Sequence, residues 1–176
     1  MIFGGAVRPA LIDINNLILD ESIHLHFDDA VDFIELLWQA LEADFYPILS
    51  FLDKSGRSKN DLAVQTHLQR LIKAGLIDAG AGQTGDASTA DYRILQHARQ
   101  FQADRPVVIT NDYYAKAYRA DARRSEPNGW NGHPDFKWLT TYVFDDMAVR
   151  ISKSSAPMTW NLRLPEGDIL TIQTRR

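Results

Sequence analysis

Short apolar runs alternate with amphipathic segments along most of this chain, and this alternation constrains the possible folds more than any other feature of the sequence. Three apolar runs have the length of buried strands: 10–12, 45–52 and 107–110. Three further segments place apolar side chains at helical spacing: 28–44, 61–75 and 89–101. Strands that alternate with helices form a parallel sheet covered by helices. The sequence therefore predicts an α/β fold with a mainly parallel central sheet.

Polar residues and glycine at the ends of these segments indicate where helices begin and end. Asp28 or Asp29 is expected to cap the N-terminus of the first helix, because a side-chain oxygen there accepts hydrogen bonds from free backbone N–H groups. Gly75 is expected to end the second helix. Residues 76–77 are then expected to open a short strand.

The last part of the chain predicts a β-hairpin. Apolar residues at 160, 162, 164, 170 and 172 alternate with polar ones, and the residues between the two runs are typical of a turn. One face of such a hairpin needs a partner, either the edge of the domain's own sheet or a second copy of the chain in a homodimer. We therefore predict a main domain at residues 1–152, with residues 153–176 as its hairpin extension.

The composition excludes several classes of protein. The chain has no cysteine, which excludes disulfides and thiolate metal sites and suits a reducing compartment. No stretch approaches the length of a membrane span and the N-terminus does not resemble a signal peptide, so we expect a cytoplasmic protein with no membrane partner. The formal net charge of −4 argues against a protein that coats nucleic acid non-specifically, but not against an enzyme that acts on it.

Three aspartates stand where a parallel sheet presents ligands. Asp13 and Asp112 each follow an apolar strand directly, and Asp91 lies where a helix begins after a glycine-rich loop. Ligands of open α/β sheets bind beyond the carboxyl ends of the strands, so these three side chains are expected to converge there. Carboxylates held close together repel one another unless a cation neutralises them, and oxygen ligands suit Mg²⁺ or Mn²⁺. Such an ion activates water and stabilises the leaving oxygen of a phosphodiester.

Helix capping is the alternative interpretation of these acids. Asp91 and Asp112 both stand at positions typical of N-caps. Asp13 differs, because no helix clearly starts after it and an acid at the end of a buried strand needs a partner. Residues 13–15 also resemble the D-x-D motif of aspartyl-phosphate phosphatases, although Asn15 replaces the second acid of that motif.

At these positions the sequence resembles the NYN branch of the PIN-like ribonucleases, in particular the Regnase-like group. The segment "LIDINN" matches a strand followed by D-x-x-N, with Asp13 and Asn16 in the matching places. The segment "ADYRIL" matches an acid near the start of a helix at Asp91. The segment "ITNDYY" matches a motif of Ser or Thr, Asn and Asp at Asn111 and Asp112.

This resemblance, which covers residues 8–151, implies a three-layer α/β/α PIN-like fold. It also implies a Mg²⁺- or Mn²⁺-dependent endoribonuclease that cleaves single-stranded RNA by means of metal-activated water. In that case Asp13, Asp91 and Asp112 bind the metal, and Asn16 orients the site.

The sequence departs from the family at two positions. Ala90 and Lys116 stand where relatives have further acids, and Asp86 could replace one of these. The departures favour a rival interpretation, a catalytically degenerate PIN-like module that binds RNA or protein without cutting. A third interpretation is a phosphohydrolase that acts on small phosphate esters.

Basic side chains near the predicted ligand edge are candidates for binding a phosphate backbone. They are Lys54, Arg57, Lys59, Arg93, Lys116 and Arg119. Aromatic residues nearby are available to stack on unpaired bases. A solvated surface and an ordinary core explain the same residues without RNA.

Overall fold

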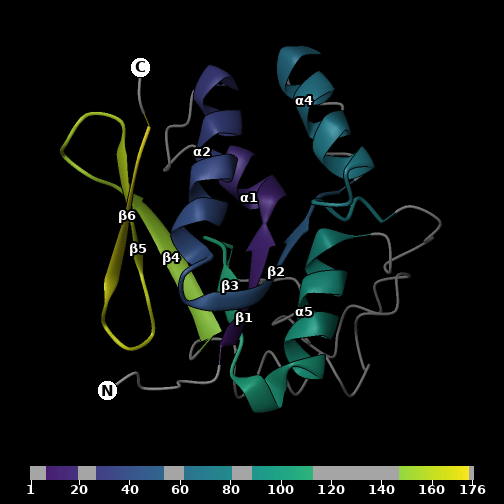
Figure 1. Ribbon diagram of the computed structural model, residues 1–176, viewed down its shortest axis with the longest axis vertical. Helices are drawn as coiled ribbons and strands as arrows, with labels where there is room; N and C mark the ends of the chain where they lie inside the picture. The colour runs from purple at the N-terminus through teal and green to yellow at the C-terminus, as the bar shows by residue number, and fades with distance from the viewer. Residues whose placement is uncertain (1–6, 20–26, 54–61, 81–88, 113–146, 175–176) are drawn as a thin grey trace, which may run out of the picture.

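The computed structural model of the chain describes residues 7–19, 27–53, 62–80, 89–112 and 147–174. These residues form a mixed α/β fold, in which six strands make one sheet and helices pack against it (Figure 1). The prediction of an α/β fold with a mainly parallel sheet is confirmed.

The sheet has a parallel part followed by an antiparallel part. Its strands are β1 (Arg8–Asp13), β2 (Phe45–Phe51), β3 (Val107–Ile109), β4 (Ala148–Lys153), β5 (Thr159–Arg163) and β6 (Ile169–Gln173). Their order across the sheet is β2-β1-β3-β4-β5-β6. Strands β1 to β4 pair in parallel, whereas β5 pairs antiparallel with both β4 and β6. A single parallel bridge joins Phe51 to Asp78, close to the short strand that the sequence predicts.

The direction in which strands are added reverses at β1. Strand β2 lies on one side of β1, and β3 lies on the other. Asp13 at the end of β1 pairs with Phe51 at the end of β2, and Ile12 pairs with Ile109 at the end of β3. The carboxyl ends of the three strands therefore lie side by side. A reversal of this kind leaves a crevice beyond the strand ends, where α/β proteins bind ligands.

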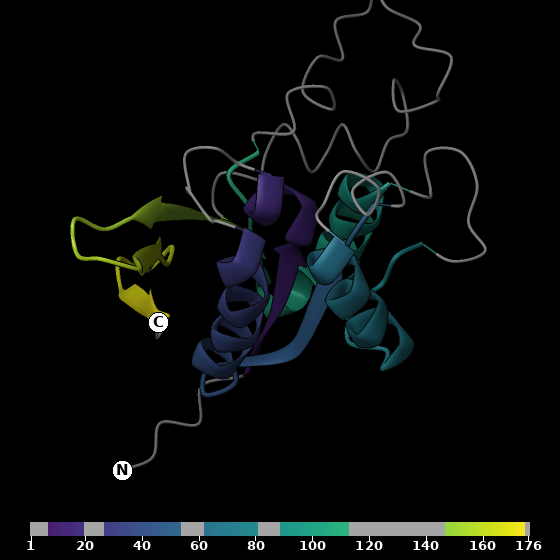
Figure 2. The same cartoon turned by 90° about the horizontal axis from the view of Figure 1, so that it is seen from above.

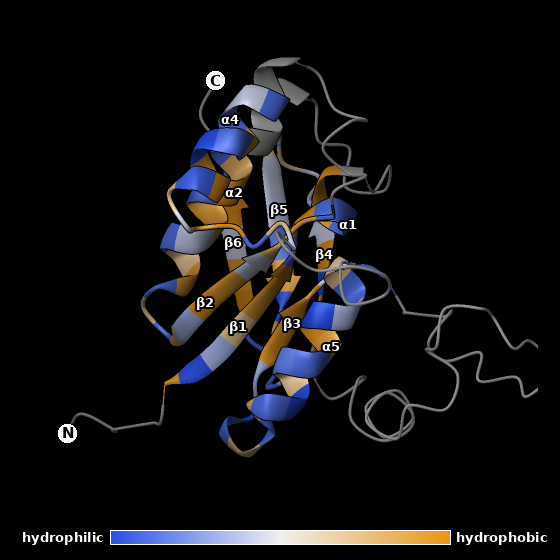
Figure 3. Cartoon of the chain, turned by 90° about the vertical axis from the view of Figure 1, so that its right-hand side faces the viewer, coloured by the Kyte–Doolittle hydropathy of each residue, from blue (hydrophilic) through white to orange (hydrophobic). Residues whose placement is uncertain are grey.

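The helices share two apolar cores with the sheet. The described helices are α1 (Ile14–Leu19), α2 (Phe27–Leu41), α4 (Leu62–Lys73) and α5 (Ala90–Gln100). Ala10 and Ile12 of β1 belong to the core shared with α1, α2 and α4, whereas Leu11 belongs to the core shared with α5. Successive side chains of a strand point to opposite faces, so both faces of β1 are apolar. Figure 3 colours the strands of the sheet by the hydropathy of their residues. None of the described helices is long and apolar enough to cross a membrane.

The antiparallel strands β5 and β6 lie beside α2 (Figures 1 and 2). Trp160 is 1% exposed and packs edge-on against Phe33 of α2, with ring centroids 5.1 Å apart. Leu162 and Ile172 are buried in the same core. The apolar face of this strand pair therefore finds its partner within the chain, at the edge of its own sheet. Homodimerisation stays a prediction.

Helix ends agree with the sequence in one place and differ in another. Gly75 follows α4 with a positive φ of 74°, its N–H donates to the carbonyl of Ile72 at 3.0 Å, and Leu76 N–H donates to that of Leu71 at 2.9 Å. The predicted glycine C-cap is thus confirmed, since only a left-handed residue closes the helix in this way. The predicted N-cap at Asp28 or Asp29 is wrong, because α2 begins at Phe27 and includes both residues.

Candidate functional site

Asp13 is the central acid at the carboxyl edge of the sheet. Helix α1 starts directly after it, which corrects the expectation that no helix begins there. Its Oδ1 accepts the backbone N–H of Asn16 at 3.1 Å, the geometry of an N-cap. Its Oδ2 accepts the Thr110 hydroxyl at 3.0 Å, and the residue is only 2% exposed. Asp13 therefore caps α1 and also contacts the segment that follows β3.

The Thr110 hydroxyl joins the two acid-bearing segments. Thr110 directly follows β3, is fully buried, and donates its N–H to the carbonyl of Val149 at 3.1 Å. The same hydroxyl that donates to Asp13 accepts the backbone N–H of Asp112 at 3.0 Å. One oxygen atom thus lies within hydrogen-bond distance of the Asp13 carboxylate and of the Asp112 backbone.

The side chains of two asparagines bind backbone groups at this carboxyl edge of the sheet. Asn16 accepts the backbone N–H of Asn111 on its side-chain oxygen, at 2.5 Å. The Asn111 side chain pairs with the backbone of Ile151: its Oδ1 accepts the Ile151 N–H at 2.8 Å, and its Nδ2 donates to the Ile151 carbonyl at 2.9 Å. Because an amide side chain has the same donor and acceptor as a peptide group, Asn111 extends the pairing of β3 with β4 by one step.

An Asn111→Asp variant is expected to destabilise the fold by about 2 kcal/mol, because a carboxylate oxygen would replace the donor that faces the Ile151 carbonyl. Urea denaturation of the variant and the wild type measures this difference. Asn161→Asp is the matched control, since Asn161 uses its side-chain oxygen to accept the Thr171 hydroxyl, and aspartate retains that oxygen. Equal losses in the two variants would contradict the assignment.

Asp91 lies in the first turn of α5. Two other residues, Thr89 and Asp53, bind the free N–H groups at the start of this helix. Thr89 is the N-cap, with its hydroxyl accepting the Tyr92 N–H at 3.3 Å, so the interpretation of Asp91 as the N-cap is wrong. The N–H of Ala90 donates to the carboxylate of Asp53, which lies just past the end of β2. The N-terminus of α5 is therefore fixed to the carboxyl end of β2, the strand next to β1.

The described residues bring the predicted metal ligands together only in part. Asp13 and Asp112 are linked through Thr110, and Asn16 contacts the same segment through Asn111. Within the described ranges, no three His, Asp or Glu side chains are grouped so that they could bind one metal ion. The structure thus supports the neighbourhood of Asp13, Asn16 and Asp112, whereas Asp91 lies in the first turn of α5.

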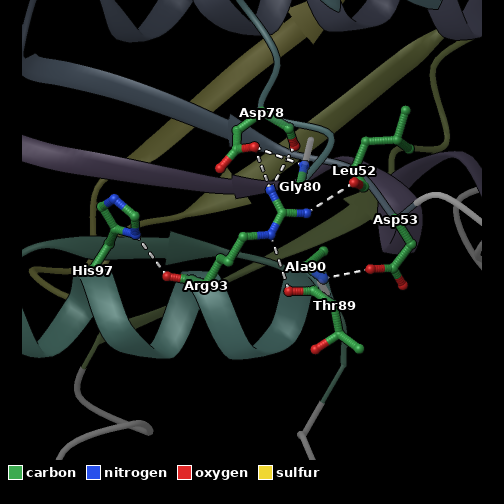
Figure 4. Close-up of polar contacts among 8 residues, drawn as sticks. All are labelled: Leu52, Asp53, Asp78, Gly80, Thr89, Ala90, Arg93 and His97. Atoms are coloured by element: carbon green, nitrogen blue, oxygen red, sulfur yellow. Dashed lines mark hydrogen bonds and ion pairs between the residues drawn. The ribbon is translucent and has the colours of Figure 1, made fainter. Parts of the chain in front are cut away.

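The prediction that Arg93 binds RNA is wrong, because its side chain is buried inside the fold (Figure 4). It is only 1% exposed, and its guanidinium donates to the carbonyls of Leu52 and Asp78, both at 2.9 Å, and of Thr89 at 3.2 Å. Its Nη1 also lies 2.7 Å from Oδ1 of the Asp78 carboxylate. These internal contacts leave no exposed cation for a phosphate. The other five basic candidates, Lys54, Arg57, Lys59, Lys116 and Arg119, lie outside the described residues.

The Asp78 carboxylate is more acidic than an ordinary aspartate. Partial burial alone would raise its pKa. The Gly80 N–H at 2.7 Å, the hydrogen bond from Arg93 and the positive charge of Arg93 together lower the pKa by more than burial raises it, so the pKa lies below its ordinary value. A carboxyl whose pKa is lower in the folded state stabilises the fold above its unfolded pKa, and this contribution is lost as the pH falls through the folded pKa.

The stability difference between wild type and an Asp78→Asn variant is therefore expected to shrink on acidification from about pH 6 to about pH 2. The reason is that only the ionised carboxylate has the charge that attracts Arg93. Urea denaturation of both proteins over this range measures the difference. A difference that stays constant with pH would contradict the role of the charge.

Two polar residues at this edge were not identified from the sequence. Asp53 fixes the start of α5, and Arg150 of β4 donates to the carbonyls of Thr110 at 3.0 Å and Asp112 at 2.5 Å. Asp53 follows an apolar strand just as Asp13 does, and this position was the available signal. Arg150 carries no comparable signal, because nothing in a strand sequence indicates which carbonyls its side chain reaches.

A comparison of the sequence with models of known protein families finds no match, and a comparison with curated proteins finds no match either.

Proposed function

We propose that the protein is a divalent-metal-dependent endoribonuclease that cleaves single-stranded RNA at the carboxyl ends of β1 and β3. The observation that supports this most is the Thr110 hydroxyl, which lies 3.0 Å from both the Asp13 carboxylate and the Asp112 backbone nitrogen. The Asp13 carboxylate and the backbone of Asp112 are thereby linked at the reversal of strand order, the usual ligand crevice of such sheets.

The acids of this edge fit a hard cation with a small protein ligand set. Mg²⁺ takes one or two carboxylates, keeps several waters and is completed by substrate phosphate oxygens. Asp13 and Asp112 would supply the two carboxylates, and Asp91 would approach from the start of α5. A carboxylate has about four lone-pair positions, and the Asn16 N–H and the Thr110 hydroxyl each donate to one oxygen of Asp13.

The residues of the chain would act by positioning. When bound, Mg²⁺ or Mn²⁺ would supply activated water and neutralise charge on the scissile phosphate. Thr110 and Asn16 N–H orient the Asp13 carboxylate, and Asn16 orients the backbone that carries Asp112. The hydrogen bonds of Arg150 to two carbonyls fix the turn after β3. The site would thus be preorganised before RNA arrives.

The finer architecture that we propose is the three-layer PIN-like fold. Two features support it: the order β2-β1-β3-β4 with parallel pairing, and the division of core residues between α2 and α4 on one side and α5 on the other. The antiparallel strands β5 and β6 would be an addition to that fold at the sheet edge.

Purified protein incubated with a fluorescent single-stranded RNA tests the activity. Internal cleavage is expected with Mn²⁺ or Mg²⁺, and none after chelation. Cleavage that persists with the chelator would overturn the metal mechanism. Hydrolysis of a chromogenic phosphate ester without RNA cleavage would support a small-molecule phosphohydrolase instead.

A module that binds RNA without cutting is the second candidate. Ala90 stands where the PIN-like ribonucleases that the sequence resembles have a further acid. Its N–H is bound by Asp53, so this position fixes α5, and the alanine side chain supplies no ligand. RNA binding without cleavage at any divalent ion concentration, in a gel-shift assay of the same preparation, would favour this candidate.

A further inference from the structure

A pocket of about 430 Å³ runs beside β2. Strand β2 is the outermost strand of the sheet order, and the pocket lies between this strand, the end of α2 and the last turn of α5. This volume is within the range of small-molecule sites. None of the residues proposed for the nuclease site lines it.

The middle of the pocket is apolar and aromatic. Trp38, Tyr46 and Ile48 contribute to its wall, and Tyr46 is 75% exposed, which is unusual for a large aromatic side chain. The Trp38 indole N–H is already used, because it donates to the Ser50 hydroxyl at 2.8 Å. The ring faces of Trp and Tyr attract cations as well as methylene groups.

A carboxylate lies at each end of the pocket. Glu42 follows α2, next to the start of β2, and Asp78 pairs with the end of β2 at Phe51. From Tyr46 to Phe51 the strand rises about 16 Å, which places the two acids at opposite ends of an elongated pocket. Lys and Arg do not occur among the described residues that line it, so the charge that it presents is negative.

Asp78 offers a hydrogen-bond acceptor at its end of the pocket. The Asp78 Oδ1 atom binds Gly80 and Arg93, which leaves Oδ2 as the atom with spare capacity. His97 contacts the Arg93 carbonyl through Nδ1 at 2.8 Å, so this nitrogen is the donor (Figure 4). An acceptor-rich pocket of this kind complements a ligand that donates hydrogen bonds.

We propose that this pocket binds a linear organic dication, an α,ω-diamine or polyamine, with one ammonium group at Glu42, the other at Asp78, and the methylene chain against Trp38 and Tyr46. Anions are disfavoured by the two carboxylates, and an uncharged chain would form no ion pair with Glu42 or with Oδ2 of Asp78. This proposal does not depend on nuclease activity, since the two sites share no residue.

Isothermal titration calorimetry with 1,8-diaminooctane, octylamine and 1,8-octanediol tests the proposal on the full chain without RNA. The diamine is expected to bind about fivefold more tightly than octylamine, because a second partly exposed charge pair adds about that factor, and the diol is expected not to bind. Equal affinities for the three compounds, or no saturable binding of the diamine, would overturn the proposal.

A Glu42→Gln variant identifies the end of the pocket that each ammonium uses. It is expected to lower the affinity for the diamine about fivefold and to change that for octylamine less than about twofold, since octylamine retains Asp78. Asp32→Asn, at an exposed position of α2 outside the pocket, is the matched control and should change neither. Equal effects of the two variants would indicate general charge attraction and reject the site. Tyr46→Ala should weaken both ligands.

Discussion

An Asp112→Asn variant is expected to lose metal-dependent cleavage of single-stranded RNA by about 100-fold or more. Asparagine has the shape of aspartate but not its charge, and a neutral amide binds Mg²⁺ or Mn²⁺ much less strongly than a carboxylate does. The backbone N–H that Asp112 donates to Thr110 is unchanged by the substitution, so the local structure should remain. Initial cleavage rates at saturating Mn²⁺ measure the loss, and thermal unfolding checks the fold.

Two further variants make this result specific. Asp13→Asn is expected to lose activity similarly, because its Oδ1 still caps α1 while the charge is removed. Asp104→Asn, an exposed carboxylate in the short helix at Gln102–Asp104, is the control that should retain wild-type cleavage. Wild-type cleavage rates in the Asp112 and Asp13 variants would refute the proposed site.

The sequence predicted those elements whose signal is local. Strands β1, β2 and β3 are short apolar runs bounded by polar residues, and α2, α4 and α5 show helical periodicity over 11 residues or more. Helix α1 was missed because it has six residues, with two asparagines in its first turn. A helix this short has no readable period, and its stability comes from the Asp13 cap and the burial of Ile14 and Leu17.

The candidate site was predictable in its position but not in its contacts. A parallel sheet presents the residues that follow its strands at one edge, which is why Asp13 and Asp112 could be placed together without coordinates. The link between them is a threonine hydroxyl 97 residues away from Asp13, and no local pattern indicates such a bond. The metal-binding role of Asp91 stays a prediction for the same reason, since sequence does not fix the approach of α5.

Arg93 shows the limit most clearly. On a helix with apolar positions at helical spacing, an arginine is normally assigned to the solvent face. Two of its acceptors are the carbonyls of Asp78 and Leu52, which are 15 and 41 residues away in the sequence. Leu52 follows β2, and Asp78 pairs with the last residue of that strand. Only after the sheet has formed do these carbonyls converge on one point, where a planar guanidinium with five donors satisfies them.

An Arg93→Met variant is therefore expected to lose about 3 kcal/mol of unfolding free energy, a decrease in the melting temperature of about 6–12 °C for a chain of this size. Methionine retains the apolar part of the side chain but leaves the buried carbonyl of Leu52 and its neighbours without their donors. Arg99→Met on the exposed side of the same helix is the control, with an expected change within about 0.5 kcal/mol. If the two variants unfolded at the same temperature, Arg93 would not be what fixes α5 to the end of β2, and the proposed approach of Asp91 to the site would need another cause.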